Sequence, residues 1–374
     1  MFEIKNKRVV FESIAPYNQQ QIEAALDWLS QNKTFVKGVQ YFHPSWSDAL
    51  VIEKLKSCQS CADFQVAFIE PMIKNLIDRS ISTLTITGLE TIKKDDHHLY
   101  ISNHRDIFLD SGLLQYTLYH RGYPFTEISL GDNLIVDDVI ERVAKLNNMF
   151  TVFRTGTKLE LLQNARNLSA YLRMALTDKK NSAWIAQGNG RTKNGDDKTF
   201  PGLISMLMMS GGSDFKTSIE ELQIVVSSVS YEYEPCALEK AVEIQTRKDT
   251  GSYTKTKYEN INSILKGIEE QKGDVNLHFE KLKVDHLAFT GNYKKDLRLI
   301  SGEIDRLVYK NYHLHKTNYM AHDLLRTSEA FADHYSEADL TNFWHYLRGC
   351  TSDLKLQDRL LKMYAQPVLN KGAC

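Results

Sequence analysis

The spacing of apolar residues predicts helices at both ends of the chain and a middle of different texture. One buried helix face near the N-terminus is marked by apolar residues at i, i+3, i+4 and i+7, namely Ile22, Ala25, Leu26 and Leu29. Asn18 and Gln21 have the spacing of a capping box, so we expect this helix to begin there. Residues 61–81 predict a second helical stretch, kinked near Pro71 because proline cannot donate a backbone hydrogen bond.

The middle of the chain alternates short β-type runs with helical ones. The β-type runs lie at residues 83–87, 99–102, 149–154, 183–187, 224–233 and 275–279. Among them, an amphipathic helix is marked by the apolar stripe Leu161, Ala165, Leu168, Leu172 and Ala175. Strands that alternate with helices predict an α/β fold, with a largely parallel sheet and helices on its faces.

From about residue 290 the pattern is helical again. Ser336 and Asp339 have capping-box spacing. A final helix is predicted to end before Pro367, and its apolar stripe is Leu356, Leu360, Met363 and Tyr364. The chain is therefore predicted to consist of an N-terminal helical region (1–80), an α/β domain (81–290) and a C-terminal helical region (291–374).

Composition and charge exclude several classes of protein. The 374 residues include 46 Lys and Arg against 47 Asp and Glu, a formal net charge of -1. A dedicated nucleic-acid binder usually carries a basic excess, so no nucleic-acid partner is expected. No apolar run approaches the ~18 residues of a membrane span, and the N-terminus lacks the apolar core of a signal peptide. We therefore expect a cytoplasmic protein.

The cysteines point to a reducing compartment and not to a metal site. Five cysteines form an odd, scattered set, which is typical of free thiols. Cys58 and Cys61 form a lone C-x-x-C pair, and no further ligands follow at the spacing of a structural zinc site. We expect no bound metal.

The segment 103–110, with the sequence NHRDIFLD, carries the densest chemistry. His104 directly follows a predicted strand and opens a helix, where α/β sheets commonly place reactive groups. A nearby carboxylate could accept one imidazole N–H, which would leave the other ring nitrogen free as a general base. Asp110 is our first choice for this carboxylate and Asp106 the second. A structural, hydrogen-bonded His104 is the alternative.

The absence of a G-x-S-x-G motif leaves this base without a serine nucleophile. Such a dyad would deprotonate an external hydroxyl, which then attacks an acyl donor. Arg154 and Arg191 also follow predicted strands. Taken alone, Arg154 would more often be a strand-end arginine in a surface ion pair, but in series with His104 and Arg191 we expect convergence on one face of the sheet. Arginine binds phosphate and carboxylate groups with two parallel hydrogen bonds, so this face suits an anionic substrate.

These segments resemble, in order, the motifs of the glycerolipid acyltransferase superfamily, the glycerol-phosphate and lysophosphatidate acyltransferases. NHRDIFLD resembles motif I, N-H-x4-D, and MFTVFRTG resembles motif II, whose arginine corresponds to Arg154. WIAQGNGRTKNGD is similar to motif III, F-P-E-G-T-R-S, and the strand at 224–233 is similar to motif IV. The resemblance covers residues 82–280, and a bacterial subgroup with S-N-H-R-D-x-x-L-D is the most similar.

The resemblance implies an O-acyltransferase that moves a fatty acyl group to a hydroxyl of a glycerol-phosphate, lysophospholipid or related lipid. It implies acyl-CoA or acyl carrier protein as donor, an anionic lipid as acceptor, no cofactor, and peripheral contact with the inner membrane. His104 would be the catalytic base, paired with Asp110 or Asp106. The residues that the resemblance assigns to substrate binding are Asn103, Arg154, Asn189, Gly190 and Arg191.

The chain also departs from the family pattern. His104 and Asp110 are one residue further apart than in N-H-x4-D, so either His104 precedes the helix or a π-bulge absorbs the extra residue. Asn189 stands in place of the motif III Glu, and Val226 in place of the motif IV Pro. These changes leave the acceptor open. They also leave two other readings: a non-catalytic lipid- or acyl-carrier-binding protein, and thioester hydrolysis by the same histidine.

Overall fold

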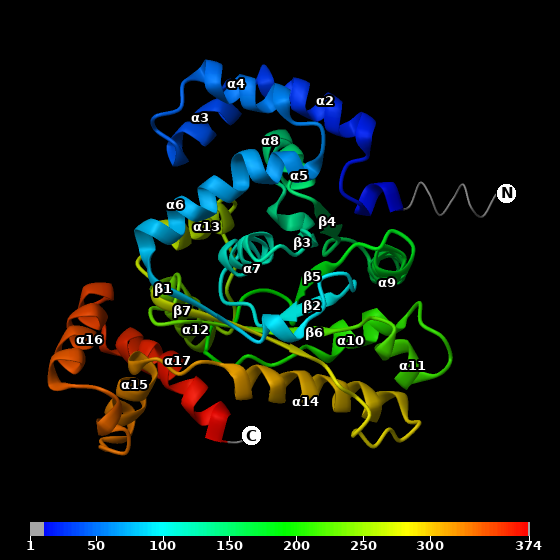
Figure 1. Cartoon of the computed structure of the whole chain (residues 1–374). Helices are drawn as coiled ribbons and strands as arrows, with labels where there is room; N and C mark the ends of the chain where they lie inside the picture. The colour runs from blue at the N-terminus through cyan, green and yellow to red at the C-terminus, as the bar shows by residue number, and fades with distance from the viewer. Residues whose placement is uncertain (1–10, 373–374) are drawn as a thin grey trace.

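A seven-stranded sheet organises the structure, a computed structural model that describes residues 11–372 (Figure 1). The strand order is β1-β7-β6-β2-β5-β3-β4. The strands are β1 (Ile81–Thr87), β2 (Leu99–Ser102), β3 (Glu127–Gly131), β4 (Met149–Val152), β5 (Ala183–Ala186), β6 (Val225–Tyr231) and β7 (Gly273–Lys281). Neighbours from β6 to β4 pair in parallel, whereas β7 is antiparallel to β6 and parallel to β1. The predicted α/β fold with a largely parallel sheet is confirmed.

Helices precede the sheet, connect its strands and follow it. Those before the sheet are α2 (Gln19–Ser30), α3 (Lys33–Phe42), α4 (Asp48–Ser57), α5 (Cys61–Phe64) and α6 (Glu70–Ser80). The connecting helices are α7 (Leu109–His120), α8 (Asp138–Leu146), α9 (Lys158–Thr177), α10 (Pro201–Met208), α11 (Phe215–Glu220), α12 (Ala237–Thr250) and α13 (Glu259–Glu269). The sheet is followed by α14 (Tyr293–Asn311), α15 (Lys316–Arg326), α16 (Glu337–Cys350) and α17 (Leu354–Gly372).

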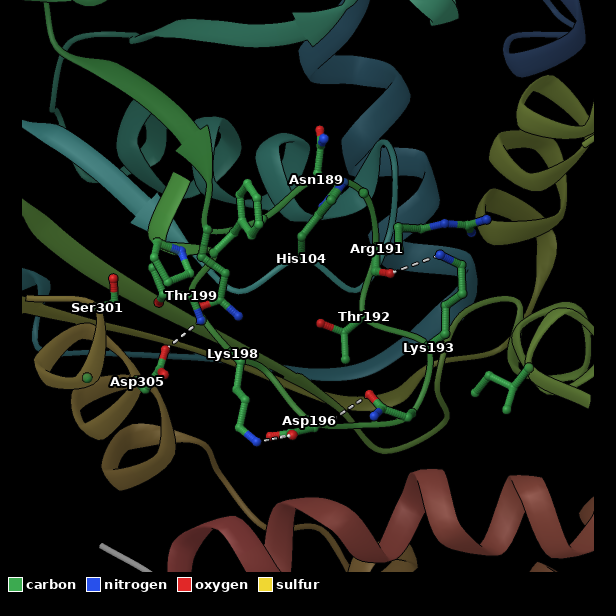
Figure 2. A pocket seen from close by; sticks show the side chains of 18 of the residues that line it. His104, Asn189, Arg191, Thr192, Lys193, Asp196, Lys198, Thr199, Ser301 and Asp305 are labelled. Carbon is green, nitrogen blue, oxygen red and sulfur yellow. Dashed lines mark hydrogen bonds and ion pairs between the residues drawn. The ribbon is translucent and has the colours of Figure 1, made fainter. Parts of the chain in front are cut away.

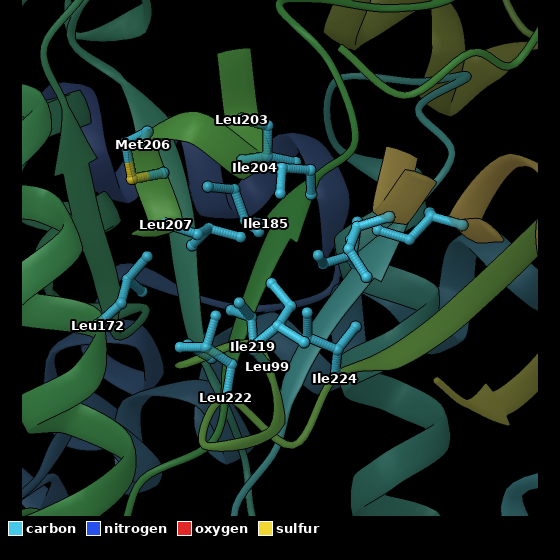
Figure 3. Packing of buried hydrophobic residues seen from close by; sticks show 14 of the residues in the cluster. Leu99, Leu172, Ile185, Leu203, Ile204, Met206, Leu207, Ile219, Leu222 and Ile224 are labelled. Carbon is cyan, nitrogen blue, oxygen red and sulfur yellow. The ribbon is translucent and has the colours of Figure 1, made fainter. Parts of the chain in front are cut away.

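Both faces of the central strands are buried. Along β2, Leu99 and Ile101 belong to the apolar cluster under α9, α10 and α14, whereas Tyr100 between them belongs to the cluster under α6 and α7. Figure 3 shows the first cluster, in which Leu172 of α9 and Leu203 of α10 lie over the sheet. Because successive strand side chains point to opposite faces, each short strand contributes to two cores. Because helices cover both faces of the sheet, we expect a binding site at the carboxyl ends of the parallel strands.

Most predicted elements are confirmed, and β3 is the strand that the pattern did not reveal. Its residues EISLG mix polar and apolar side chains, so no apolar run marks the strand. Glu127 is nevertheless buried, and its carboxylate accepts hydrogen bonds from the Tyr171 hydroxyl and, at 3.1 Å, from Asn181. Both predicted capping boxes are present, at the starts of α2 and α16.

The two prolines behave differently from one another. Near Pro71, where the sequence predicts a kink, the structure has a π-helical turn, Gln65–Ile69, and Pro71 lies in the first turn of α6. The prediction that the last helix stops before Pro367 was wrong, since α17 continues through it to Gly372. Burial of Tyr364 and Val368 on either side of Pro367 holds the helix together although one backbone hydrogen bond is missing.

Within residues 11–372 the structure describes the state of the cysteines, the grouping of metal-ligating side chains and the length and hydropathy of the helices. The four cysteines there (Cys58, Cys61, Cys236 and Cys350) are free thiols. No group of three His, Cys, Asp or Glu side chains in this range is placed to hold a metal ion. None of the helices in this range is both long and apolar enough to cross a bilayer.

A test of the packing between α17 and the loop after β5 uses two glycines of that loop. Gly195 (φ +81°) and Gly190 (φ +96°) both have left-handed backbones, but a Cβ at Gly195 would lie 2.2 Å from the Met363 carbonyl oxygen, whereas at Gly190 it would meet nothing within 4 Å. We expect Gly195→Ala to lower the free energy of unfolding by roughly 3 kcal/mol and Gly190→Ala by about 1 kcal/mol, measured by urea denaturation. Equal losses would show that backbone conformation alone matters.

Candidate active site

His104 lies two residues after the end of β2 and is paired with Asp110 in the first turn of α7. The distance from His104 Nδ1 to Asp110 Oδ2 is 2.9 Å, and the two side chains are 12% and 1% exposed. The ring of Trp184 on β5 packs edge-on against the imidazole, with 6.1 Å between ring centres. His104 Nε2 makes no hydrogen bond within residues 11–372. The arrangement leaves that nitrogen available to a bound molecule.

The Asp110 carboxylate is held by four donors. Oδ2 accepts hydrogen bonds from His104 and from the backbone N–H groups of Arg105 (2.6 Å) and Asp106 (2.9 Å), and Oδ1 accepts one from the Tyr231 hydroxyl (2.8 Å). Burial and the neighbouring Asp110 raise the pKa of Tyr231, so the hydroxyl stays protonated. The carboxylate can therefore fix both the tautomer and the orientation of the imidazole.

The extra residue between histidine and aspartate forms a turn and not a bulge. His104 precedes the helix, and residues 105–108 lie outside α7, which begins at Leu109. Asp106 Oδ1 accepts hydrogen bonds from the N–H groups of Phe108 and Leu109, both at 2.9 Å. Its second oxygen faces Gly267 of α13, where a Cβ would approach to 2.5 Å. Asp106 thus caps α7 and does not contact His104.

Asn103, which the resemblance assigned to substrate binding, joins two strands. Its side chain is fully buried, donates to the Val229 carbonyl (2.8 Å) and to Asp197 (3.1 Å), and accepts from the Val229 N–H (2.8 Å). The structure therefore directs Asn103 into the protein and not towards a substrate. Its amide fixes the end of β2 against β6, directly before His104.

A buried ion network lies under the same segment. Arg105, which is 1% exposed, donates to Asp197 (2.6 Å) and Glu234 (3.1 Å), and Lys240 of α12 donates to the Arg105 carbonyl (2.6 Å). Lys240 also pairs with Glu234 at 2.5 Å. Sequence patterns did not predict this network, because its members are far apart in the chain and charged residues are usually exposed.

The loop after β5 contains Arg191 and lies next to His104. The Thr192 N–H donates to the His104 carbonyl at 2.7 Å, which holds the loop across the site. Arg191 is 9% exposed, and its Nη2 donates to Ser263 at 3.2 Å. Its Nη1 is buried and has no hydrogen-bond partner within residues 11–372. A buried cation without a carboxylate partner is costly, so this position is suited to an anion.

His104, Arg154 and Arg191 line one cavity of about 90 Å³, together with Lys255; we call it the cation cavity. Arg154 follows β4 and lies over the end of β3, where a Cβ at Gly131 would be 3.0 Å from its Nε. Among the described residues, no Asp or Glu side chain lines this cavity. Three cations without a carboxylate make it a site for a strongly negative group.

Lys255 is a site residue that sequence reasoning missed. It lies in the segment between α12 and α13, where no motif or periodicity marks it. Its Nζ donates to Asn260 at 2.8 Å, and its nearest carboxylate, Glu259, is 3.9 Å away. Burial and the nearby Arg191 lower the pKa of Lys255. Only the fold, which brings α13 against the loop after β5, makes this lysine part of the site.

A larger cavity of about 930 Å³ adjoins the cation cavity and shares His104, Gly190 and Arg191 with it. Figure 2 shows His104, Asn189 and Arg191 on one side of the large cavity, with Ser301 of α14 among its other walls. Its remaining cations include Lys193 and Arg247, which share Glu243 at 3.3 and 2.7 Å, and Arg298 of α14, which has no ion pair within the described chain. This cavity has room for a ligand of cofactor size.

A third cavity, the apolar slot, has a volume of about 180 Å³ and runs between α9 and α10. It shares Arg154 with the cation cavity and Asn189 with the large cavity. Its apolar lining includes Leu161 and Leu168 of α9, Leu203 and Met206 of α10, and Ile185 of β5. Figure 3 shows the packing of Ile185, Leu203 and Met206. A chain of methylene groups fits such a lining.

Comparisons with known proteins find no sequence match and a solved structure of weak similarity. No protein-family model matches the chain, and no curated protein sequence matches it significantly. The chain is similar to the crystal structure of the 1-acyl-sn-glycerophosphate acyltransferase PlsC from Thermotoga maritima, with 12% sequence identity and a TM-score of 0.38. The superposition covers 77% of this chain and 95% of that one.

The cation cavity predicts binding of inorganic phosphate, and Lys255 provides a test. We expect Lys255→Gln to weaken binding about tenfold, the loss of one charge-assisted hydrogen bond, measured by isothermal titration calorimetry. Lys193→Gln is the matched control, because Lys193 is paired with Glu243 and lies outside the cation cavity.

The lowered pKa of Lys255 adds a pH signature. As the pH rises, its ammonium loses a proton earlier than an ordinary lysine, so phosphate affinity should fall on the alkaline side. Lys255→Arg should keep the affinity to higher pH, since a guanidinium stays charged. Equal weakening by Lys255→Gln and Lys193→Gln would remove Lys255 from the site.

Proposed function

We propose that the protein is an O-acyltransferase that moves a fatty acyl group from a thioester donor to a hydroxyl of an anionic lipid. One observation carries the proposal: His104, paired with Asp110 and without a hydrogen bond at Nε2 within residues 11–372, lines a cavity together with three cations and no carboxylate. The adjoining apolar slot supports a substrate that is both anionic and apolar, because the two cavities share Arg154. Glycerol-phosphate and lysophospholipid acceptors have this chemistry.

In the proposed reaction His104 Nε2 takes the proton of the acceptor hydroxyl. The hydroxyl oxygen attacks the thioester carbonyl and forms a tetrahedral intermediate, which collapses as the carbon–sulfur bond breaks. The leaving thiolate takes the proton back from the imidazolium, so atoms and charge balance. Asp110 stays ionised and stabilises the imidazolium meanwhile. The reaction uses no metal or cofactor, and the thioester donor is a substrate.

The oxyanion of the intermediate needs hydrogen-bond donors. The backbone N–H groups of Asn189 and Arg191 flank Gly190 in the loop across the site, and within residues 11–372 they have no hydrogen-bond partner. At Gly190 a side chain would meet nothing within 4 Å, so a substrate can approach the backbone closely there. We assign these two N–H groups to the oxyanion.

The cavities divide the substrates between them. Arg154, Arg191 and Lys255 would hold the acceptor's anionic group, and its acyl chain would lie in the apolar slot. The large cavity, which also reaches His104, would admit the donor. Acyl-CoA and acyl carrier protein both remain candidate donors. Such substrates imply peripheral contact with the inner membrane from the cytoplasm.

The catalytic assignment is tested by acyl transfer from labelled acyl-CoA and from labelled acyl carrier protein to a lipid extract. Loss of a general base typically lowers the reaction rate by about 10²–10⁴-fold. His104→Ala should therefore reduce the rate of product formation by about that factor with whichever donor the wild type uses. Equal product from wild type and His104→Ala would overturn the assignment and favour a non-catalytic lipid-binding protein. Free fatty acid as the only product would identify a thioesterase.

The carboxylate is tested by comparing Asp110→Asn with Asp106→Asn. Asp110→Asn should lower kcat by about 10² or more, because the imidazole loses the acceptor that fixes its tautomer. Asp106→Asn should lower kcat less than about tenfold, because the Asn oxygen can still accept from Phe108 and Leu109. Circular dichroism controls for folding in both variants. A larger loss at Asp106 would reassign the pair.

A further inference from the structure

Three exposed apolar side chains belong to the two chain segments, around α9 and α10, that form the apolar slot. Leu159 and Leu162, in the first turns of α9, are 77% and 42% exposed, and Phe200, which precedes α10, is 55% exposed. Leu161, between the two leucines, lines the slot, and Phe200 lines both the slot and the large cavity. Phe200 therefore lies at the slot itself, and Leu159 and Leu162 are the exposed neighbours of the slot-lining Leu161 in the first turns of α9. We call the three exposed side chains the mouth patch.

The exposure of these leucines is not a result of a frayed helix end. Thr157 and Glu160 form a capping box that holds the first turn of α9. Leu159 and Leu162 are spaced i, i+3 and so share one face, away from the buried stripe that includes Leu168 and Leu172. Single exposed leucines are ordinary, but two exposed leucines on one helix face, with a slot-lining leucine between them in sequence, are an apolar group of the kind that marks an interaction site.

The charges beside the mouth patch are basic. Lys158 starts α9, and Arg166 follows Leu162 by four residues on the same face. Neither makes an ion pair within residues 11–372. The one acid of this turn, Glu160, is bound by the N–H and the hydroxyl of Thr157. Apolar side chains with unpaired cations beside them match an anionic lipid surface.

We propose that the mouth patch, with Lys158 and Arg166, docks onto an anionic lipid bilayer and opens the apolar slot to it. The bilayer as partner rests on the proposed function, in which a lipid enters the slot. A second copy of the chain fits less well, because a two-fold contact through this patch would bring the two sets of cations together.

The test is flotation of the full chain with phosphatidylcholine vesicles, with and without phosphatidylglycerol. Leu159→Ser with Leu162→Ser should lower partition onto anionic vesicles about tenfold or more, since two apolar side chains no longer enter the interface. The matched control is Leu354→Ser, because Leu354 on α17 is 78% exposed and lies outside the slot. It should bind as wild type does. Lys158→Gln with Arg166→Gln should remove the preference for phosphatidylglycerol.

Three results would overturn the proposal: unchanged flotation of the double leucine variant, an equal loss for Leu354→Ser, or a change in oligomeric state of the leucine variant without a change in flotation. The last result would identify a second copy as the occupant. Flotation does not depend on catalysis, so vesicle binding without acyl transfer would refute the proposed function and leave the docking surface standing. If both hold, the leucine variant should keep activity on a water-soluble short-chain acceptor and lose it on a vesicle-embedded one.

Discussion

The site depends on the buried ion network around Arg105. This one residue follows His104 in sequence and ties the segment of the histidine to the loop after β5 through Asp197 and to the end of β6 through Glu234. Lys240 adds α12 by donating to the Arg105 carbonyl. Removing one partner of a buried ion pair typically costs about 3–5 kcal/mol, so these four segments hold one another in place. None of Arg105, Asp197, Glu234 and Lys240 lines one of the three cavities, so the imidazole is positioned by residues that lie outside them.

The same network explains why the cation cavity is positive in a chain of net charge -1. Arg105 and Lys240 are matched by Asp197 and Glu234, so these two buried carboxylates are already paired. Glu243 is likewise shared by two cations of the large cavity. Within residues 11–372 no Asp or Glu side chain lines the cation cavity itself, and the carboxylate of Glu259 lies 3.9 Å from Lys255. An anionic ligand would complete this charge distribution.

The sequence predicted the fold and the centre of the site better than its surroundings. Alternating or apolar runs revealed six strands, and the NHRD segment led to the histidine and to its first-choice partner, because these signals are local. β3 was missed since its buried Glu127 obtains its partners from distant elements. Asn103 and Lys255 show the same limit: whether a polar side chain faces inward or into a cavity depends on contacts made more than 60 residues away.

The longer spacing between His104 and Asp110 has a structural consequence. Asp110 lies in the first turn of α7, where the helix dipole favours a negative charge. In the turn that precedes the helix, the backbone N–H groups of Arg105 and Asp106 converge on one oxygen of this carboxylate. His104 is therefore only one of four donors to Asp110. Loss of the imidazole would leave the carboxylate held, whereas loss of the carboxylate would release both the imidazole and the turn. The shape of the turn and the orientation of the base are in this way coupled through one side chain.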